Sequence, residues 1–382
     1  MTNKLSSISP TDISPIHVFR ETPAKLIKNS ARNVVLDLMR GLAAIAVLIF
    51  HISYMLGSFA LNINKGYLAV DFFFILSGFV ITANYHTTIR KDLTLFAFLS
   101  ARLARLWPLF LLTTLFGFII VTTKLNRDFG YFDTEKSFTS LALNSVMLPS
   151  FMKTYGIDRL FMFNGASWSV FFELLVNIIF FTFLRNLSLR VLIAISVVLA
   201  SILCLFGHAN GNLDGGWSTA TFHIGLARVL FGFTVGMVVY LISKKINFKS
   251  NNIITLSTLV CLCLTFFAIG NWITDCLVVI FLYPILLLIA SQCKLSDFAR
   301  PVGGRLGDIS YSVYLIQTPA MMLVAGFSQI LFGTKIANFA PISGIIFIIA
   351  ILFISYACWR YFEVPSRNYL RKKLCMPQSR KD

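Results

Sequence analysis

Apolar runs long enough to cross a lipid bilayer recur along most of this chain. A helix needs about 20 mainly apolar residues to span the hydrocarbon core, where backbone groups must be satisfied internally. With 57% hydrophobic and 13% charged residues, the chain does not have the composition of a soluble globule. We therefore predict an all-α, polytopic membrane helical bundle of about ten transmembrane helices. The predicted spans are 36–57, 66–86, 103–122, 167–185, 189–207, 223–243, 252–270, 272–290, 307–331 and 340–361.

The placement of Lys and Arg supports this count and predicts an orientation. Of the 33 basic residues, 25 lie in the N-terminal tail, alternate loops or the C-terminal tail, which share one side of the predicted bundle. The positive-inside rule then places both termini in the cytoplasm. The net charge of +17 is scattered over many short loops, so it indicates topology and not nucleic-acid binding. The opposite side holds Lys65, Lys124, Arg127, Lys136, Lys153, Arg159 and Lys335, and Arg228 lies inside a span.

A weaker apolar run at 137–152 is short and contains Pro149, so we interpret it as an interfacial or re-entrant segment. An eleventh span would also break the alternation of charge. We expect one membrane domain at 34–370, between a flexible cytoplasmic tail at 1–33 and a basic cytoplasmic tail at 371–382. The first tail lacks an apolar core of signal-peptide length. The seven cysteines do not have zinc-ligand spacing, and no metal site is predicted.

Ionisable residues within the first two spans are candidates for function. Arg40 and His51 are eleven residues apart, which places them on one helix stripe about 16 Å apart along the axis. Ionisable groups are costly in a membrane helix and usually face its protein interior. We interpret His51 as functional, whereas Arg40 taken alone is better explained as a snorkelling boundary residue. Asp71 needs a partner such as Arg228 or His51, and a purely structural ion pair is as compatible as a functional one.

Arg102 and Arg105 share a face at the cytoplasmic start of the third span and are followed by Trp107. Paired guanidinium groups bind phosphate oxygens through bidentate, charge-assisted hydrogen bonds. Taken alone, these residues are better explained by positive-inside anchoring beside an interfacial tryptophan, which needs no ligand.

Polar residues follow a helical row in the fourth span. Ser169, Glu173 and Asn177 are spaced i, i+4 and i+8, directly after Trp168. Such a row favours a lined cavity over contact with lipid. If the span begins near 167 at the outer surface, Glu173 lies about 9 Å below that surface.

The ninth span carries a comparable row, in which Ser310, Tyr314 and Gln317 are accompanied by Tyr311. Residues of these types also commonly form structural hydrogen bonds between membrane helices. By predicted depth, the outer half of the bilayer holds His51, Asp71, Glu173 and Arg228. The inner edge holds Arg40, Arg102, Arg105 and Arg305. A cationic inner mouth and an acid–base cluster above it suit a phosphate-bearing compound that enters from the cytoplasm.

These residues form six motifs whose order and spacing resemble acyltransferase family 3 of integral membrane proteins, over about residues 34–370. The motifs are Arg40-x10-His51, Val70-Asp71-x-Phe73-Phe74-x-x-Ser77-Gly78-Phe79, Arg102-x-x-Arg105, Trp168-Ser169-x-x-x-Glu173, Ser310-Tyr311-Ser312-x-Tyr314-Leu315 and Glu363-x-Pro365-x-Arg367. The resemblance implies a ten-helix enzyme of the bacterial cytoplasmic membrane. Such enzymes move an acyl group, usually acetyl from acetyl-CoA, to a hydroxyl of an extracytoplasmic or lipid-linked glycan.

The resemblance also implies roles for individual residues. It makes His51 catalytic and implicates Arg40, Arg102 and Arg105 in activity or acyl-CoA handling. Many members carry a histidine where this chain has Gln317, so a second-histidine role is not carried over.

On this basis we hypothesise that His51 acts as general base or is itself acylated. Glu173 or Asp71 would orient the imidazole, and Arg228, Tyr311 or Tyr314 would polarise the thioester oxygen. Trp168 and Ser169 complete the substrate-site candidates.

Two other classes of function compete with this hypothesis. Intramembrane carboxylates and histidines also serve proton relays, so a secondary transporter or a flippase of lipid-linked sugars is the main alternative. Against it, the sequence shows no inverted repeat and no matching pair of Gly/Pro-broken spans. A non-catalytic scaffold or sensor derived from an enzyme fold is the third reading. The presence of both His51 and Glu173 disfavours it.

Overall fold

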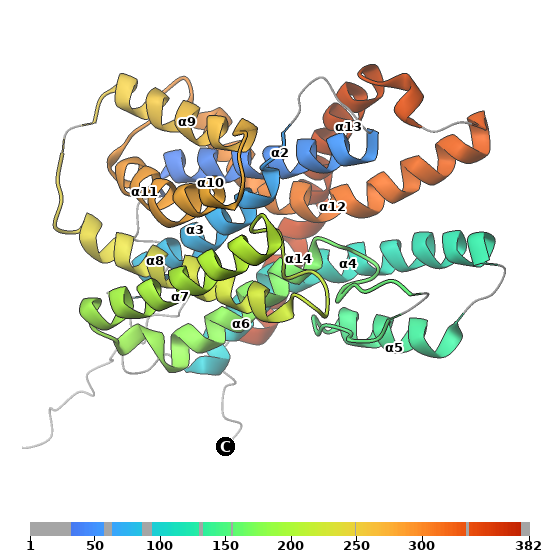
Figure 1. Cartoon of the computed structure of the whole chain (residues 1–382), viewed down its shortest axis with the longest axis horizontal. Coiled ribbons are helices and arrows are strands. Elements are labelled where there is room, and N and C mark those ends of the chain that lie inside the picture. The colour runs from blue at the N-terminus through green and yellow to red at the C-terminus, as the bar shows by residue number, and fades with distance from the viewer. Residues whose placement is uncertain are drawn as a thin grey trace, which may run out of the picture.

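The computed structural model describes residues 32–56, 63–85, 94–129, 133–153, 156–248, 250–333 and 336–375. The regular elements of these residues are all helices (Figure 1). The tails expected at 1–33 and 371–382 lie outside them, apart from Arg32, Asn33 and residues 371–375, which continue a helix. Arg127 and Lys335 also have no described side chain.

Each of the ten predicted spans is a helix, which confirms the expected fold class. Eight helical segments are long and apolar enough to cross a membrane, and α6 and α9 are shorter apolar helices. The single-helix spans are α2 (Val34–Leu56), α3 (Ala69–Tyr85, after the short η2 at Gly66–Leu68), α4 (Leu95–Phe129), α6 (Ser167–Thr182), α7 (Leu189–Asn210), α8 (Phe222–Ser243), α9 (Asn252–Phe267) and α12 (Arg300–Phe332). Two spans are compound, namely α10–η4–α11 (Trp272–Leu277, Val278–Leu282, Tyr283–Gln292) and α13–η6–α14 (Ile342–Cys358, Trp359–Glu363, Val364–Cys375).

Local sequence explains several of the helix boundaries. Ser188 begins α7 by accepting a hydrogen bond from the Val191 amide. Asn251 and Asn271 accept in the same way at the starts of α9 and α10. Capping side chains of this kind satisfy backbone N–H groups that have no partner within the helix. Gly211 ends α7 with a φ of 79°, a left-handed conformation that glycine adopts without steric cost.

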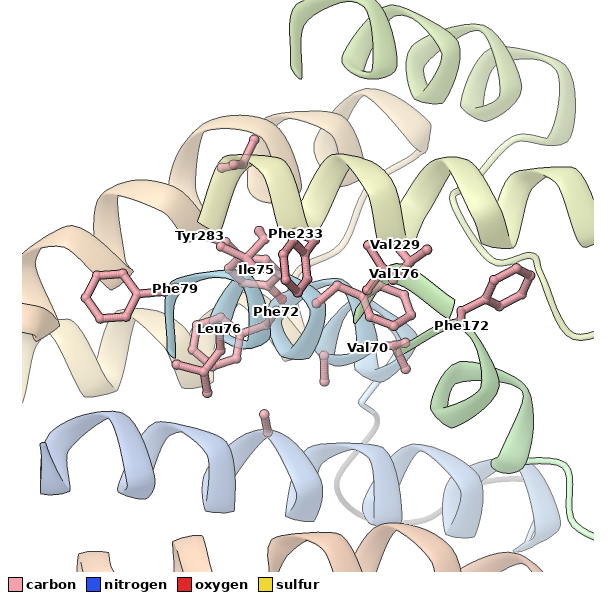
Figure 2. Close-up of a cluster of buried hydrophobic side chains, with 14 of the residues drawn as sticks. Val70, Phe72, Ile75, Leu76, Phe79, Phe172, Val176, Val229, Phe233 and Tyr283 are labelled. Carbon is pink, nitrogen blue, oxygen red and sulfur yellow. The ribbon is translucent and has the colours of Figure 1, made fainter. Parts of the chain in front are cut away.

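The centre of the bundle is the crossing of α3 with α8. Gly232 and Gly236 form a small-xxx-small pair on α8, and Gly78 faces it from α3. A Cβ atom on Gly236 would lie 2.1 Å from the Ile75 carbonyl oxygen, so the two backbones are in direct contact there. Figure 2 shows buried side chains around α3, among them Phe72 and others from α6, α8 and α11.

The second close pair is α2 with α12, which run side by side although nearly 270 residues separate them (Figure 1). Gly41 and Gly307 allow this approach, because a Cβ atom on Gly307 would lie 2.5 Å from Asp37 Cβ. By contrast, helix α7 and the compound span that begins with α13 are mostly exposed. Only 17% and 22% of the residues in their apolar stretches are buried, as expected of helices that face lipid.

Helix direction defines the two ends of the bundle. We call the end at which α2, α4, α7, α9 and α12 begin the basic end. Arg32, Lys244, Lys294, Arg300 and Arg371 lie there. The other end carries the loop 211–221 between α7 and α8.

The segment expected to be interfacial or re-entrant contains α5 (Thr134–Ser145), a 12-residue helix beside α4. The chain then runs into the bundle, where Asn164 Nδ2 donates to Thr113 Oγ1 at 3.1 Å and to the Leu315 carbonyl at 3.0 Å. Thr113 and Leu315 lie near the middles of α4 and α12. Helix α6 therefore starts half way through the bundle and points toward the basic end.

This start overturns one depth prediction. Glu173 does not share the outer half of the bundle with His51, because α6 does not begin at that surface. Six residues beyond Ser167, Glu173 lies 3.6 Å from Arg102 on α4.

Candidate active site

A cavity lies between the middle of the bundle and the basic end, bounded by α2, α3, α4, α6 and α12. It holds about 800 Å³ of space, including its open mouth. Five of the six sequence motifs contribute polar side chains to its wall, although they are distant in the chain. Seven of the predicted site residues line it: Arg40, Arg102, Arg105, Ser169, Glu173, Tyr311 and Tyr314.

Arg40 is held firmly in this wall. Its Nη2 donates to the Gly307 carbonyl at 2.6 Å, its Nε donates to Ser310 Oγ at 3.0 Å, and Asp37 lies 3.2 Å away. The close approach of α2 to α12 brings these partners within reach. The guanidinium is therefore fixed beside the cavity and is not a freely snorkelling boundary group.

Arg102 and Arg105 are less completely paired. Arg102 Nη2 lies 3.6 Å from Glu173 Oε1, which also accepts from Ser77 Oγ at 3.3 Å. Arg102 Nε is buried without a hydrogen-bond partner. Arg105 makes no hydrogen bond or ion pair with any residue that the structure describes. The cavity thus has donor groups available for an anion.

The closing motif of the sequence stabilises the wall from outside. Glu363 is buried in η6 and accepts from Ser312 Oγ at 2.8 Å. Tyr311 donates from Oη to the Leu106 carbonyl at 2.6 Å, next to Arg105. These bonds tie α12 to η6 and α4. The Tyr311 proton is committed to that carbonyl, so it is not free to polarise a thioester.

The inner end of the cavity is closed by aromatic and hydroxyl groups. Tyr314 is the lining residue farthest along α12, and its ring meets that of Phe73 edge-on at 5.8 Å. Tyr314 Oη and Ser169 Oγ are 2.7 Å apart. Since Ser169 gives its own proton to the Ala166 carbonyl at 3.2 Å, Tyr314 is the donor of this bond.

His51 is not among the lining residues of this cavity. It lies beyond the inner end, one turn past Tyr314, where its imidazole meets Gln317 of α12. The Phe50 ring packs near it at 5.5 Å, and Arg159 acts on it electrostatically from the loop before α6. His51 Nδ1 is buried and has no hydrogen-bond partner.

The carboxylates expected to orient this imidazole do not reach it. Asp71 forms a buried, bidentate pair with Arg228, with N–O distances of 2.9 and 2.7 Å. Arg228 was one of the two partners predicted for Asp71. The prediction that Asp71 or Glu173 orients the imidazole is wrong, because the first carboxylate is committed to Arg228 and the second to Arg102 and Ser77.

Arg228 is likewise occupied and does not line the cavity. It is fully buried, donates to the carbonyls of Gly215 and Tyr67 at 2.6 and 3.2 Å, and lies 5.3 Å from the Trp168 ring centroid. Four of the five donors of this guanidinium are used in the network, and the group is fully buried away from the cavity, so it is not placed to polarise a thioester there. The prediction of that role for Arg228 is wrong. Trp168 therefore packs against the Asp71–Arg228 pair and does not line the cavity.

A second buried charge network was missed by sequence reasoning. Asp275 in α10 binds Lys65 at 2.7 Å and accepts from Tyr67 Oη at 2.6 Å and from the Leu213 amide at 3.0 Å. It joins α10 to η2 and to the loop 211–221. An aspartate inside an apolar span, as at Asp71, was the available signal.

The described residues contain no group of three His, Cys, Asp or Glu side chains that could hold a metal ion. The cavity and its surroundings offer arginine, hydroxyl and imidazole groups instead. Such groups bind anions and handle protons.

The fold and this cavity define a multi-pass helical membrane protein with a polar site enclosed by its spans. A family model described as an acyltransferase domain, of family 3, matches residues 33–360. The chain therefore belongs to this family of acyltransferases, as its motifs predicted. It is 29% identical over 181 residues to "Protein 2 in picA locus" of Rhizobium radiobacter, a match that covers 45% of this chain and 93% of that protein. No solved structure matches the chain.

Proposed function

We propose that the protein is an O-acyltransferase that transfers an acyl group, acetyl in the first instance, from acyl-CoA to a hydroxyl of a surface or lipid-linked glycan. The observation that carries the proposal is the cavity in which Arg40, Arg102 and Arg105 converge, with His51 beyond its inner end. Membership of an acyltransferase family supports the reaction class. Acetyl-CoA and the glycan are our proposals.

The orientation proposed for the bundle places the basic end and both termini in the cytoplasm. The excess of Lys and Arg at that end supports it through the positive-inside rule. The cavity then opens toward the compartment that supplies acyl-CoA. We place the protein in the cytoplasmic membrane of a bacterium, and the bacterial source of the similar protein supports this location.

The three arginines are proposed to hold the phosphates of the donor. Arg40 is fixed by Gly307 and Ser310, while Arg102 Nε and the whole Arg105 guanidinium have unused donors. Arginine binds phosphate bidentately, and each charge-assisted hydrogen bond contributes about 1.5–3 kcal/mol. The apolar wall between these arginines and Tyr314 suits the pantetheine arm of the donor.

The transfer step is proposed to take place between Tyr314 and His51. The neutral imidazole takes the proton of the acceptor hydroxyl as its oxygen attacks the thioester carbon. The carbon–sulfur bond then breaks, and the imidazolium returns the proton to the leaving thiolate. In the covalent variant the imidazole attacks the thioester carbon and the carbon–sulfur bond breaks to release the thiolate. The acceptor hydroxyl then attacks the acyl-imidazole, its proton passes to the thiolate, and the neutral imidazole is released. Tyr314 and Ser169 are the hydroxyl groups nearest this path that line the cavity.

The proposal is tested on the surface glycans of cells that lack the gene and are complemented with variants. We expect wild-type protein to restore an O-acyl ester and His51→Ala to abolish it at equal membrane level. The matched control is His223→Ala, because His223 is exposed at the start of α8. Equal ester content with His51→Ala would remove this residue from the chemistry. Proton-coupled uptake by proteoliposomes without consumption of acyl-CoA would instead favour a transporter.

A further inference from the structure

The imidazole of His51 has an amide, and not a carboxylate, as its side-chain neighbour. Gln317 lies against it from α12 and is fully buried. The two acids within the neighbouring helices are bound elsewhere, Asp71 to Arg228 and Glu173 to Arg102. Among the side chains that the structure describes, Gln317 is the hydrogen-bonding neighbour found for the ring, and it is therefore the candidate that orients it.

The orientation of the Gln317 amide follows from its other contact. Its Nε2 donates to the Tyr314 carbonyl at 3.1 Å. A backbone carbonyl oxygen can only accept, so the amide nitrogen must face Tyr314. The amide oxygen, Oε1, then faces away from that carbonyl, and it is buried without a hydrogen-bond partner.

The complementary atom on the ring is also without a partner. His51 Nδ1 is buried with no hydrogen bond, while the residue as a whole is partly exposed. A neutral imidazole carries one N–H, and an amide oxygen only accepts. Leaving buried polar atoms unpaired is unfavourable, and a proton on Nδ1 directed at Oε1 satisfies both atoms at once.

We propose that Gln317 is a positioning residue that holds the His51 proton on Nδ1 and leaves the Nε2 lone pair free to accept the proton of the acceptor hydroxyl. This inference rests on the proposed function of His51. The tautomer is set here in the way a carboxylate sets it in hydrolase triads, but without adding a charge.

Because Gln317 is uncharged, it orients the His51 ring without changing the charge next to it. The charged group that acts on His51 from the packed elements is Arg159, in the loop before α6. A glutamate at 317 would place a negative charge against the ring and favour the imidazolium. That form is not a base, so the pH at which activity appears would rise.

The tautomer can be observed directly, without any turnover. The chain has five histidines, so the ¹⁵N spectrum of histidine-labelled protein in nanodiscs can be assigned to His51 by comparison with His51→Gln. We expect the wild-type ring to carry its proton on Nδ1, and Gln317→Met to lose this preference. Gln329→Met is the matched control, since Gln329 is exposed on the same helix. A wild-type ring with its proton on Nε2 would overturn the inference.

Kinetics of acyl transfer give an independent readout. Gln317→Met should lower kcat about 10–100-fold at unchanged KM for acyl-CoA, within the range of general-base effects. Gln317→Glu should retain more activity than Gln317→Met and move the acidic limb of the pH profile upward by about one unit. A merely structural role would lower the amount of folded protein without moving that limb.

The two proposals fail in distinguishable ways. If wild-type protein consumes no acyl-CoA, the proposed function fails while the spectrum still decides the tautomer. If wild-type protein is active but Gln317→Met matches it in kcat, only the role of Gln317 is lost.

Discussion

The buried pair of Asp71 and Arg228 allows a quantitative test of what holds the centre of the bundle. Both side chains are excluded from solvent, with exposed fractions of 1% and 0%. Removing one partner of such a pair costs about 3–5 kcal/mol, because the other charge stays buried. In Asp71→Leu the guanidinium keeps its bonds to the Gly215 and Tyr67 carbonyls, so we expect a loss near the lower figure, about 3 kcal/mol.

Arg228→Met should lower the free energy of unfolding by more, about 5 kcal/mol, because it leaves the Asp71 carboxylate and the Gly215 and Tyr67 carbonyls buried without a donor. The double variant carries no buried charge. We expect it to be no less stable than Arg228→Met, which, with single losses of about 3 and 5 kcal/mol, corresponds to a coupling of at least about 3 kcal/mol between the two sites.

Thermal unfolding in nanodiscs, followed by tryptophan fluorescence, provides the assay, because Trp168 packs on Arg228. At about 2 °C per kcal/mol, the single variants should melt about 6–10 °C below wild type. Asp297→Leu, which removes an exposed partner of Arg300, should not change the melting temperature. A double variant that is less stable than both single variants would refute the reasoning.

Three further predictions follow from single contacts. Hydrogen bonding from the Thr219 side chain, together with the Thr219 amide that donates to Asp158 at 3.0 Å, lowers the pKa of Asp158. These bonds should therefore stabilise the loop 211–221 fully above about pH 4 and be lost as pH falls below that value. Proteolysis of the loop should therefore accelerate at low pH in wild type, and Asp158→Asn should lack this dependence. Gly236→Val should abolish folded protein in membranes, measured by gel filtration, whereas Gly326→Val, where a Cβ meets open space, should behave as wild type. Arg105→Ala should raise KM for acyl-CoA about 10-fold, and an equal effect with donors that lack phosphates would contradict the phosphate role.

The fold was predictable because the bilayer imposes a strong constraint on sequence. All ten spans were located from the length of apolar runs, since backbone groups in hydrocarbon must be satisfied within a helix. The long-range pairing of α2 with α12 was not predictable. It depends on Gly41 facing Leu306 and Gly307 facing Asp37, and the sequence does not indicate either of these partners.

The sequence predicted most of the residues of the candidate site, but it did not predict which of them bind one another. The residues Arg40, Arg102, Arg105 and Glu173 were singled out correctly as neighbours of a cavity. The predicted depth of Glu173 was wrong, because hydrogen bonds from Asn164 to α4 and α12 place the start of α6 in the middle of the bundle.

The partner of His51 could not be derived from spacing alone. Carboxylates were expected because they orient imidazoles well, yet each is bound by an arginine from another helix. The sequence placed Gln317 in the polar row of the ninth span and at a position where the family resemblance implied a histidine, and neither observation predicted its contact with His51. Its contact with His51 depends on the crossing of α2 and α12.

The most direct test of the account is transfer of label from ¹⁴C-acetyl-CoA to glycan in inside-out membrane vesicles. The account predicts base-labile label on glycan with wild-type protein and with His223→Ala, and none with His51→Ala at equal protein level. Label transfer by His51→Ala at the wild-type rate would contradict it.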